Sequence, residues 1–339
     1  MKLSHIGKAR RIYREMKRNA EYSDLVEEYS GKIINGRRIL EPRANYWLGF
    51  FHIHRNGIPF YDLAKRIREI GGDFVVLANH EWDENQKSKE RFEDDEVAKF
   101  FEIDGKIIII IKGLECNLKD EDYNHILSNK GKKIIIAGYR GRIKPNRNLE
   151  EVIDSCKKNG GIVLASACFN EGSRGLDRES LDRHFDDIDA IGILDSAFGL
   201  GFLRLSQLHY SDILAKHYAL GNNSRGERKA MFSEGNAHTL SEIGFAGDYF
   251  RRDYLSSLSS IEELKKEPQR LIEEIKRAFK DSARFPNEEI VINSGNYLPP
   301  WMIFDPKRIC VVFEEFAESC ERKAQKIKKF LEKRRREVK

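Results

Sequence analysis

The sequence predicts an α/β fold in which one sheet of mainly parallel strands curls into a barrel. Short apolar runs rich in isoleucine, valine and phenylalanine recur along the chain, and amphipathic stretches with helical spacing separate them. Because each helix must cover the outside of one parallel sheet, seven such units over about 200 residues suit a closed or nearly closed (βα)7 barrel. A doubly wound open sheet is the alternative.

Seven apolar runs are the predicted strands of this sheet. The stretch after the first run places Leu63, Ile67 and Ile70 on one face of a helix that ends at Gly71. The sequence EEVIDSCKKNGG repeats this design before the fifth run. In chain order the runs are LGFFHIH (48–54), DFVVLAN (73–79), KIIIIIK (106–112), KKIIIA (132–137), GIVLAS (161–166), IDAIGIL (188–194) and AMFSE (230–234).

The barrel is expected to occupy residues 47–250, between two extensions. Residues 1–46 are basic and predicted to be helical. Residues 251–339 are predicted to be mainly helical, because SSIEELKKEPQRLIEEIKRAF has a helical pattern and a final amphipathic helix follows it. The last part, residues 322–339, carries ten Lys or Arg against two Glu, so these basic ends could bind nucleic acid, although a solvated helix face explains such charge more often.

The composition argues against several classes of protein. A chain of 339 residues, 40% hydrophobic and 34% charged, can bury a full core. No run approaches the roughly 18 apolar residues of a membrane span, and the N-terminal segment lacks the apolar core of a secretory signal. The five cysteines form no CxxC pair, which argues against a disulfide framework or a structural zinc knuckle. We therefore expect a cytoplasmic protein without membrane contact, whereas its oligomeric state is not indicated.

Polar side chains that bind metals follow the predicted strands at the points where they end. His52 and His54 close the first strand, two residues apart and therefore on the same side of an extended chain. The others, after the second, third and seventh strands, are His80, Glu115, Asn236 and His238. Because the loops after parallel strands form one face of a barrel, four of the chain's nine histidines should meet there with a carboxylate.

Such a set of ligands favours a catalytic divalent metal. Imidazole and carboxylate groups bind Zn, Mn or Fe and leave positions open for water. A bound metal lowers the pKa of that water and neutralises a phosphoryl oxygen, so hydrolysis needs little further chemistry from the protein. Any one of these histidines alone would more commonly be a hydrogen-bonded loop or core residue, and the hypothesis depends on the whole set.

Five motifs that contain these residues resemble those of the PHP (polymerase and histidinol phosphatase) superfamily, metal-dependent phosphoesterases on a distorted (βα)7 barrel. The sequence GFFHIHRNG resembles the opening HxH motif, FVVLANHEW the TDH motif, GLEC the glutamate motif and SEGNAH the closing SDAH motif. The sequence YNHIL is similar to a further ligand motif, which implies that His125 is also a ligand. The resemblance spans about residues 50–245 and keeps the order of the family's motifs.

The chain departs from this family at several ligand positions. Ser166 stands where the family has a histidine after the fifth strand, Asn236 replaces the closing aspartate and Asn79 the acidic residue before His80. By resemblance, three ions would have three ligand sets: His52, His54 and Glu115; Glu115 and His125; and His80 and His238. Because an amide is a weaker ligand than a carboxylate, one or two ions are expected rather than three.

Three further residues on these loops have possible roles. Arg140 and Arg174 follow the fourth and fifth strands, where a guanidinium could hold a phosphate, or could be an ordinary surface charge. Cys168 could supply a thiolate ligand for zinc, but the favoured interpretation is a buried, inert cysteine.

Two functions remain open from the sequence. The favoured one is a metal-dependent hydrolase of phosphate esters, with a phosphomonoester, a nucleotide or a nucleic-acid end as substrate. The alternative is a PHP-like binding module that has lost its catalytic activity and contacts nucleic acid through its basic termini. The retained ligands favour the enzyme, whereas Ser166 and Asn236 favour the binding module.

Overall fold

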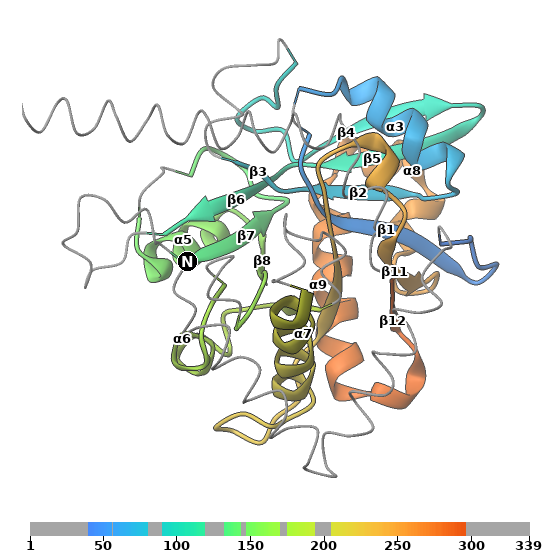
Figure 1. The fold of residues 1–339 in the computed structure, drawn as a ribbon. Coiled ribbons are helices and arrows are strands. Elements are labelled where there is room, and N and C mark those ends of the chain that lie inside the picture. The colour runs from blue at the N-terminus through green and yellow to red at the C-terminus, as the bar shows by residue number, and fades with distance from the viewer. Residues whose placement is uncertain are drawn as a thin grey trace, which may run out of the picture.

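One curled sheet organises the chain in a computed structural model that describes residues 40–55, 57–80, 90–118, 132–143, 147–169, 175–193 and 205–295 (Figure 1). The predicted N-terminal extension lies almost entirely outside these residues, and the predicted final helix lies outside them completely. In the described part of the chain, no helix combines the length and apolar character that crossing a membrane requires.

The sheet contains twelve strands. They are β1 (Tyr46–Ile53), β2 (Phe74–Leu77), β3 (Asn79–His80), β4 (Ala98–Ile103), β5 (Lys106–Ile111), β6 (Gly113–Asn117), β7 (Lys133–Ala137), β8 (Ile162–Ala165), β9 (Ala190–Ile193), β10 (Met231–Ala237), β11 (Ala246–Arg251) and β12 (Val291–Gly295). All seven predicted runs form strands, and the other strands either extend these or flank them.

The pairing of the strands makes the sheet curl back on itself. Hydrogen bonds link the strands in the order β3-β6-β7-β8-β9-β10-β1-β2-β5-β4. Only Ala78 separates β2 from β3, and only Lys112 separates β5 from β6. Because β2 pairs with β5 and β3 pairs with β6, both in parallel, the path returns to its beginning. This arrangement is consistent with a barrel.

The strict alternation of parallel strand and helix does not hold along this path. β7 runs antiparallel to both β6 and β8, whereas β1, β2, β5, β8, β9 and β10 form parallel pairs. The prediction of a parallel fourth strand was therefore wrong, because an apolar run carries no information about its direction. β4 forms an antiparallel hairpin with β5, and β12 joins the sheet through β11 although it lies within the extension predicted for residues 251–339.

The described helices lie between or beside these strands. They are α3 (Phe60–Glu69), α5 (Leu149–Lys158), α6 (Arg178–Arg183), α7 (Leu205–Ala219), α8 (Ile261–Lys266) and α9 (Gln269–Arg284). Asn148 caps α5 by accepting a hydrogen bond from the amide of Glu151 at 2.8 Å. The segment predicted as one helix after residue 259 divides into α8 and α9 around Pro268, which has no amide hydrogen to donate to the turn before it.

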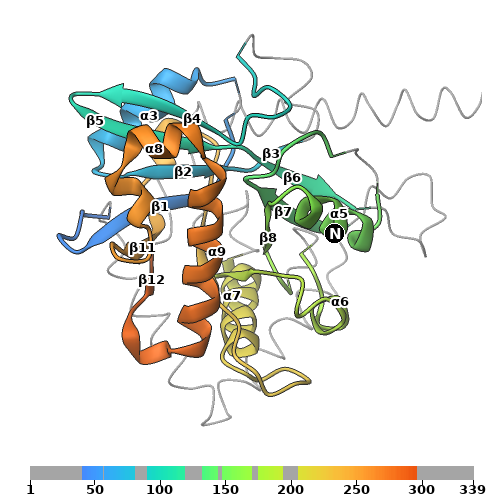
Figure 2. The ribbon, with the colours of Figure 1, turned by 180° about the vertical axis from the view of Figure 1, so that it is seen from behind.

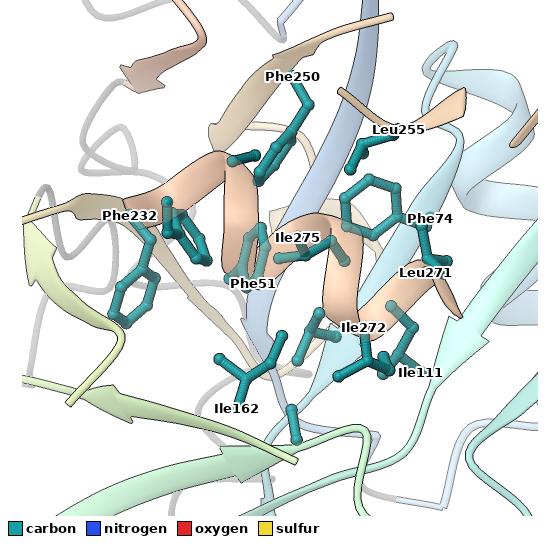
Figure 3. Packing of buried hydrophobic residues seen from close by; sticks show 14 of the residues in the cluster. Phe51, Phe74, Ile111, Ile162, Phe232, Phe250, Leu255, Leu271, Ile272 and Ile275 are labelled. Atoms are coloured by element: carbon teal, nitrogen blue, oxygen red, sulfur yellow. The ribbon is translucent and has the colours of Figure 1, made fainter. Parts of the chain in front are cut away.

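The helix α9 packs its apolar face against the sheet (Figure 2). Ile272 and Ile275 belong to one buried cluster with Phe51 and Phe74 (Figure 3), and Phe279 of the same helix lies 5.8 Å from Phe51 between ring centroids. At its N-terminal end, the side-chain amide of Gln269 donates to the carbonyls that follow β7 and precede β8. Gln269 therefore lies at the start of β8, a strand that runs parallel to its neighbour β9. The helix α9 thus begins at the end of the sheet opposite the carboxyl ends of the parallel strands.

A buried carboxylate in β11 should make the stability of this sheet depend on pH. Asp248 is fully buried, accepts from the amide of Ser233 at 3.0 Å and from the side chain of Asn293 at 2.8 Å, and burial raises its pKa to about 7. The folded protein therefore keeps this proton between the unfolded value of 3.8 and about 7, whereas the unfolded chain loses it. The stabilisation is complete below the unfolded pKa and is lost as pH rises through the folded pKa.

We therefore expect the unfolding free energy to fall by on the order of 2 kcal/mol between pH 5 and pH 8, relative to the Asp248→Asn variant. Urea denaturation at the two pH values measures the difference. Asp253→Asn, which changes a carboxylate that is 63% exposed, is the matched control and should keep the pH dependence of the native sequence. The same slope in Asp248→Asn as in the native sequence would contradict the assignment.

Candidate metal centre

Backbone strain marks the carboxyl ends of three strands. The register of β1 shifts between Phe51 and Ile53 toward β10 and between Phe50 and Ile53 toward β2, and His52 within both shifts has a φ of 61°. Ala167, just after β8, has a φ of 48°, and Asn236 in β10 has a φ of 39°. A residue with a side chain pays roughly 1–3 kcal/mol for such a conformation, and these positions gather at functional sites. The three together indicate this end of the sheet as the place of function.

His52, His54 and Glu115 bring three metal-ligating atoms together at this end. One such atom from each residue lies within 4.8 Å of the other two. The Nε2 atoms of the two histidines are 3.1 Å apart, and Nε2 of His52 lies 3.8 Å from Oε1 of Glu115. All three side chains are buried, so water competes little with a bound ion.

Glu234, a carboxylate at the end of the seventh predicted run that was not predicted as a site residue, orients His52. It is 1% exposed, and its Oε2 lies 2.9 Å from Nδ1 of His52. Its Oε2 also accepts from the hydroxyl of Ser166 at 2.7 Å, and its Oε1 accepts from the amide of Ala167 at 2.8 Å. Because a carboxylate can only accept, the network assigns the proton of His52 to Nδ1, which leaves the lone pair on Nε2 for a metal.

Gly192 and Ser166 provide the space for this carboxylate. A Cβ on Gly192 in β9 would clash with Oε1 of Glu234. Ser166 is fully buried, and its small side chain lies 3.2 Å from Nδ1 of His52 as well as donating to Glu234. Together, the small side chains at these two positions leave room for the carboxylate of Glu234 beside His52.

His238 and Asn236 follow the same end of β10. The ring of His238 stacks on that of His54, with 4.4 Å between centroids and 12° between planes, and its amide donates to Glu242 at 2.8 Å. The ring of His238 thus covers one face of the His54 ring. Asn236 has a left-handed backbone conformation, which asparagine tolerates better than most residues. This conformation favours an asparagine at the position independently of the ligand role predicted for it.

The backbone of His80 lies beside that of Glu115, because β3 and β6 pair with these two residues in register. The structure describes no side-chain position for His80, so its role as a ligand stays a prediction. The side chain of Asn79 accepts from the amide of Arg55 at 3.0 Å and so fixes the chain just after His54. His125 and Arg174 lie outside the described residues.

The reversed direction of β7 separates Arg140 from this centre. Its amide donates to the carbonyl of Asn159, which precedes β8, so it lies at the end of the sheet opposite His52. The arrangement does not bring Arg140 together with the predicted ligands. The same reversal places the start of β7 at the centre, where Nζ of Lys133 lies 2.8 Å from Oε2 of Glu115.

Cys168 packs as a small buried side chain. Its thiol is 1% exposed and donates to the carbonyl of Ala165 at 3.4 Å. Burial, together with the negative charge of Glu234, raises the pKa of the thiol well above its usual value. The interpretation as a buried cysteine is confirmed, and this environment disfavours the thiolate that zinc would require.

The donor set fits a divalent metal of the Zn, Mn or Fe type. Two imidazole nitrogens and one carboxylate oxygen converge, which is the three-ligand pattern of catalytic sites that leave a position for water or substrate. The carboxylate partner on the far nitrogen of His52 is the usual support of a metal-binding histidine. Nothing in these contacts distinguishes among the three metals.

Comparisons with known proteins give distant likenesses. No family model and no curated protein matches the sequence. PsfC from Pseudomonas syringae PB-5123 is 13% identical with a TM-score of 0.38, and the match covers 61% of this chain and 83% of that protein. A candidate metal-dependent phosphoesterase from Bifidobacterium adolescentis ATCC 15703 is 15% identical with a TM-score of 0.35, and the match covers 60% of this chain and 91% of that protein.

Proposed function

We propose that this chain is a metal-dependent hydrolase of phosphate esters that acts on a phosphomonoester, a nucleotide or a nucleic-acid end. The observation that carries the proposal is the convergence of His52, His54 and Glu115, supported by Glu234. These three ligands belong to two of the motifs through which the sequence resembles the PHP superfamily, with His52 and His54 at the end of β1 and Glu115 in β6. The proposal therefore includes membership of that superfamily.

In such a site, some residues would bind the ion and others would orient these ligands. A bound ion would activate a water molecule for attack and neutralise the oxygens of the phosphoryl group. His52 and His54 would hold the ion with neutral nitrogens, and Glu115 would supply the negative charge. Glu234 keeps the proton of His52 on the nitrogen that faces away from the ion, and His238 keeps the ring of His54 in plane. Burial of the ligands limits the water that competes for the ion.

The experiment that tests the proposal is a hydrolysis assay with the full chain, supplied in turn with Zn, Mn and Fe. A panel of p-nitrophenyl phosphate, bis-p-nitrophenyl phosphate, nucleotides and 5′- or 3′-phosphorylated oligonucleotides covers the three substrate classes. We expect metal-dependent release of product from at least one class, and its loss in Glu115→Gln. Metal binding without hydrolysis of any substrate would contradict the enzyme and support the binding module.

A further inference from the structure

We propose that Lys133 takes the place of a second cation beside Glu115, so that the centre binds one divalent ion and not two. The inference rests on the proposed function, because it concerns the same metal centre. It assigns a role to a residue that belongs to none of the motifs shared with the PHP superfamily.

The direction and register of β7 place Lys133 at the centre. In the antiparallel pair of β6 and β7, Glu115 lies opposite Ile135 and Asn117 lies opposite Lys133. Residues two apart on a strand share one face, so Lys133 lies on the same face as Glu115 and is its diagonal neighbour, a distance that a long side chain can span. A parallel β7 would have put its first residue at the other end of the sheet.

The two oxygens of Glu115 face different neighbours. Oε1 lies 3.8 Å from Nε2 of His52, on the side where the histidines converge, whereas Oε2 lies 2.8 Å from Nζ of Lys133. The ion pair is sheltered, because the side chain of Glu115 is 4% exposed and that of Lys133 is 22% exposed. The carboxylate therefore has one oxygen for a metal and one for the ammonium group.

An ammonium group in this position excludes a second ion because it occupies the same volume and repels the positive charge. A metal bound to Oε2 would need to lie at about 2.0–2.2 Å from it, within the volume next to the Lys133 nitrogen. It would also bring a charge of two close to the charge of one on Lys133, in surroundings less polar than water. Among the described residues, the buried carboxylates around the centre are Glu115, Glu234 and Glu242, so Lys133 and one divalent ion already balance their negative charge.

Metal titration of three variants tests the inference. Lys133→Met removes the charge, Lys133→Arg keeps it, and Lys132→Met is the matched control because Lys132 pairs with Asp177 at 2.8 Å and not with Glu115. Isothermal titration with Mn and Zn, with elemental analysis after gel filtration, gives the number of ions per chain. Circular dichroism melting verifies that each variant is folded.

We expect about one ion per chain in the native sequence, Lys133→Arg and Lys132→Met, and a rise toward about two in Lys133→Met. Two ions in the native sequence would overturn the inference and leave the proposed function intact. The same would follow if Lys133→Met bound one ion with unchanged affinity. Absence of metal from every variant would instead overturn the proposed function, and this inference with it.

Discussion

Replacing Glu115 by glutamine should weaken metal binding by at least about 100-fold and abolish hydrolysis. Glu115 is the one carboxylate in the three-ligand group found among the described residues. Glutamine has nearly the same shape but is neutral, so it is a weaker ligand for a divalent ion. The change also deprives Lys133 of the opposite charge that lies 2.8 Å away, which leaves a partly buried ammonium group near the ion.

Metal affinity by titration and hydrolysis rate under metal saturation measure this effect. Glu102→Gln, on the exposed face of β4, is the matched control and should change neither quantity. Asn236→Asp should have a smaller effect than Glu115→Gln and should keep or strengthen metal binding, because aspartate also tolerates the left-handed backbone. If Glu115→Gln bound metal as tightly as the native sequence, Glu115 would not be a ligand.

The second large effect should follow from Glu234→Gln, with metal binding weaker by about 10–100-fold although Glu234 touches no ion. The amide group of glutamine has one acceptor oxygen, whereas the carboxylate accepts from His52, Ser166 and Ala167. An NH2 group facing His52 would favour the tautomer with its proton on Nε2, and that nitrogen then has no lone pair for a metal.

Nitrogen-15 NMR of the histidine rings reports this tautomer directly. The native sequence should show His52 protonated on Nδ1, and Glu234→Gln should shift the population toward Nε2. Glu274→Gln is the matched control, because Glu274 is also a buried carboxylate but accepts from Ser256 and Ser257 instead. It should lower thermal stability without changing metal affinity. Equal losses of metal affinity in the two variants would contradict a specific role for Glu234.

The sequence predicted the strands well because their signal is local. Each of the seven apolar runs is long enough, and bounded clearly enough by glycine or charged residues, to predict where a strand lies. The direction of β7 and its pairing depend on tertiary contacts, so neither was visible. β3 and β6 were missed as separate strands because each follows its predecessor after a single residue, and Glu115 lies within β6 and not after it.

The site was predicted in part for the same reason. His52 and His54 share a face through the period of a strand, and Glu115 lies on a segment that continues a predicted strand, so the sequence was enough to group them. The role of Glu234 could not be predicted, because its partners come from β1 and from the end of β8, which are distant in the sequence. In the sequence it is a carboxylate at the end of an apolar run. In the sequence, Lys133 has the pattern of a solvated residue at the start of a strand. Its place beside Glu115 follows only once the direction of β7 is known.

Anomalous X-ray diffraction at the metal absorption edge, on crystals of the full chain purified without chelator and supplied with Zn or Mn, would locate the bound ion directly. We expect one anomalous peak bound by the Nε2 atoms of His52 and His54 and by Oε1 of Glu115, at about 2.0–2.2 Å from each. Absence of a peak at these residues, together with metal content below about a tenth of an equivalent after supplementation, would contradict it.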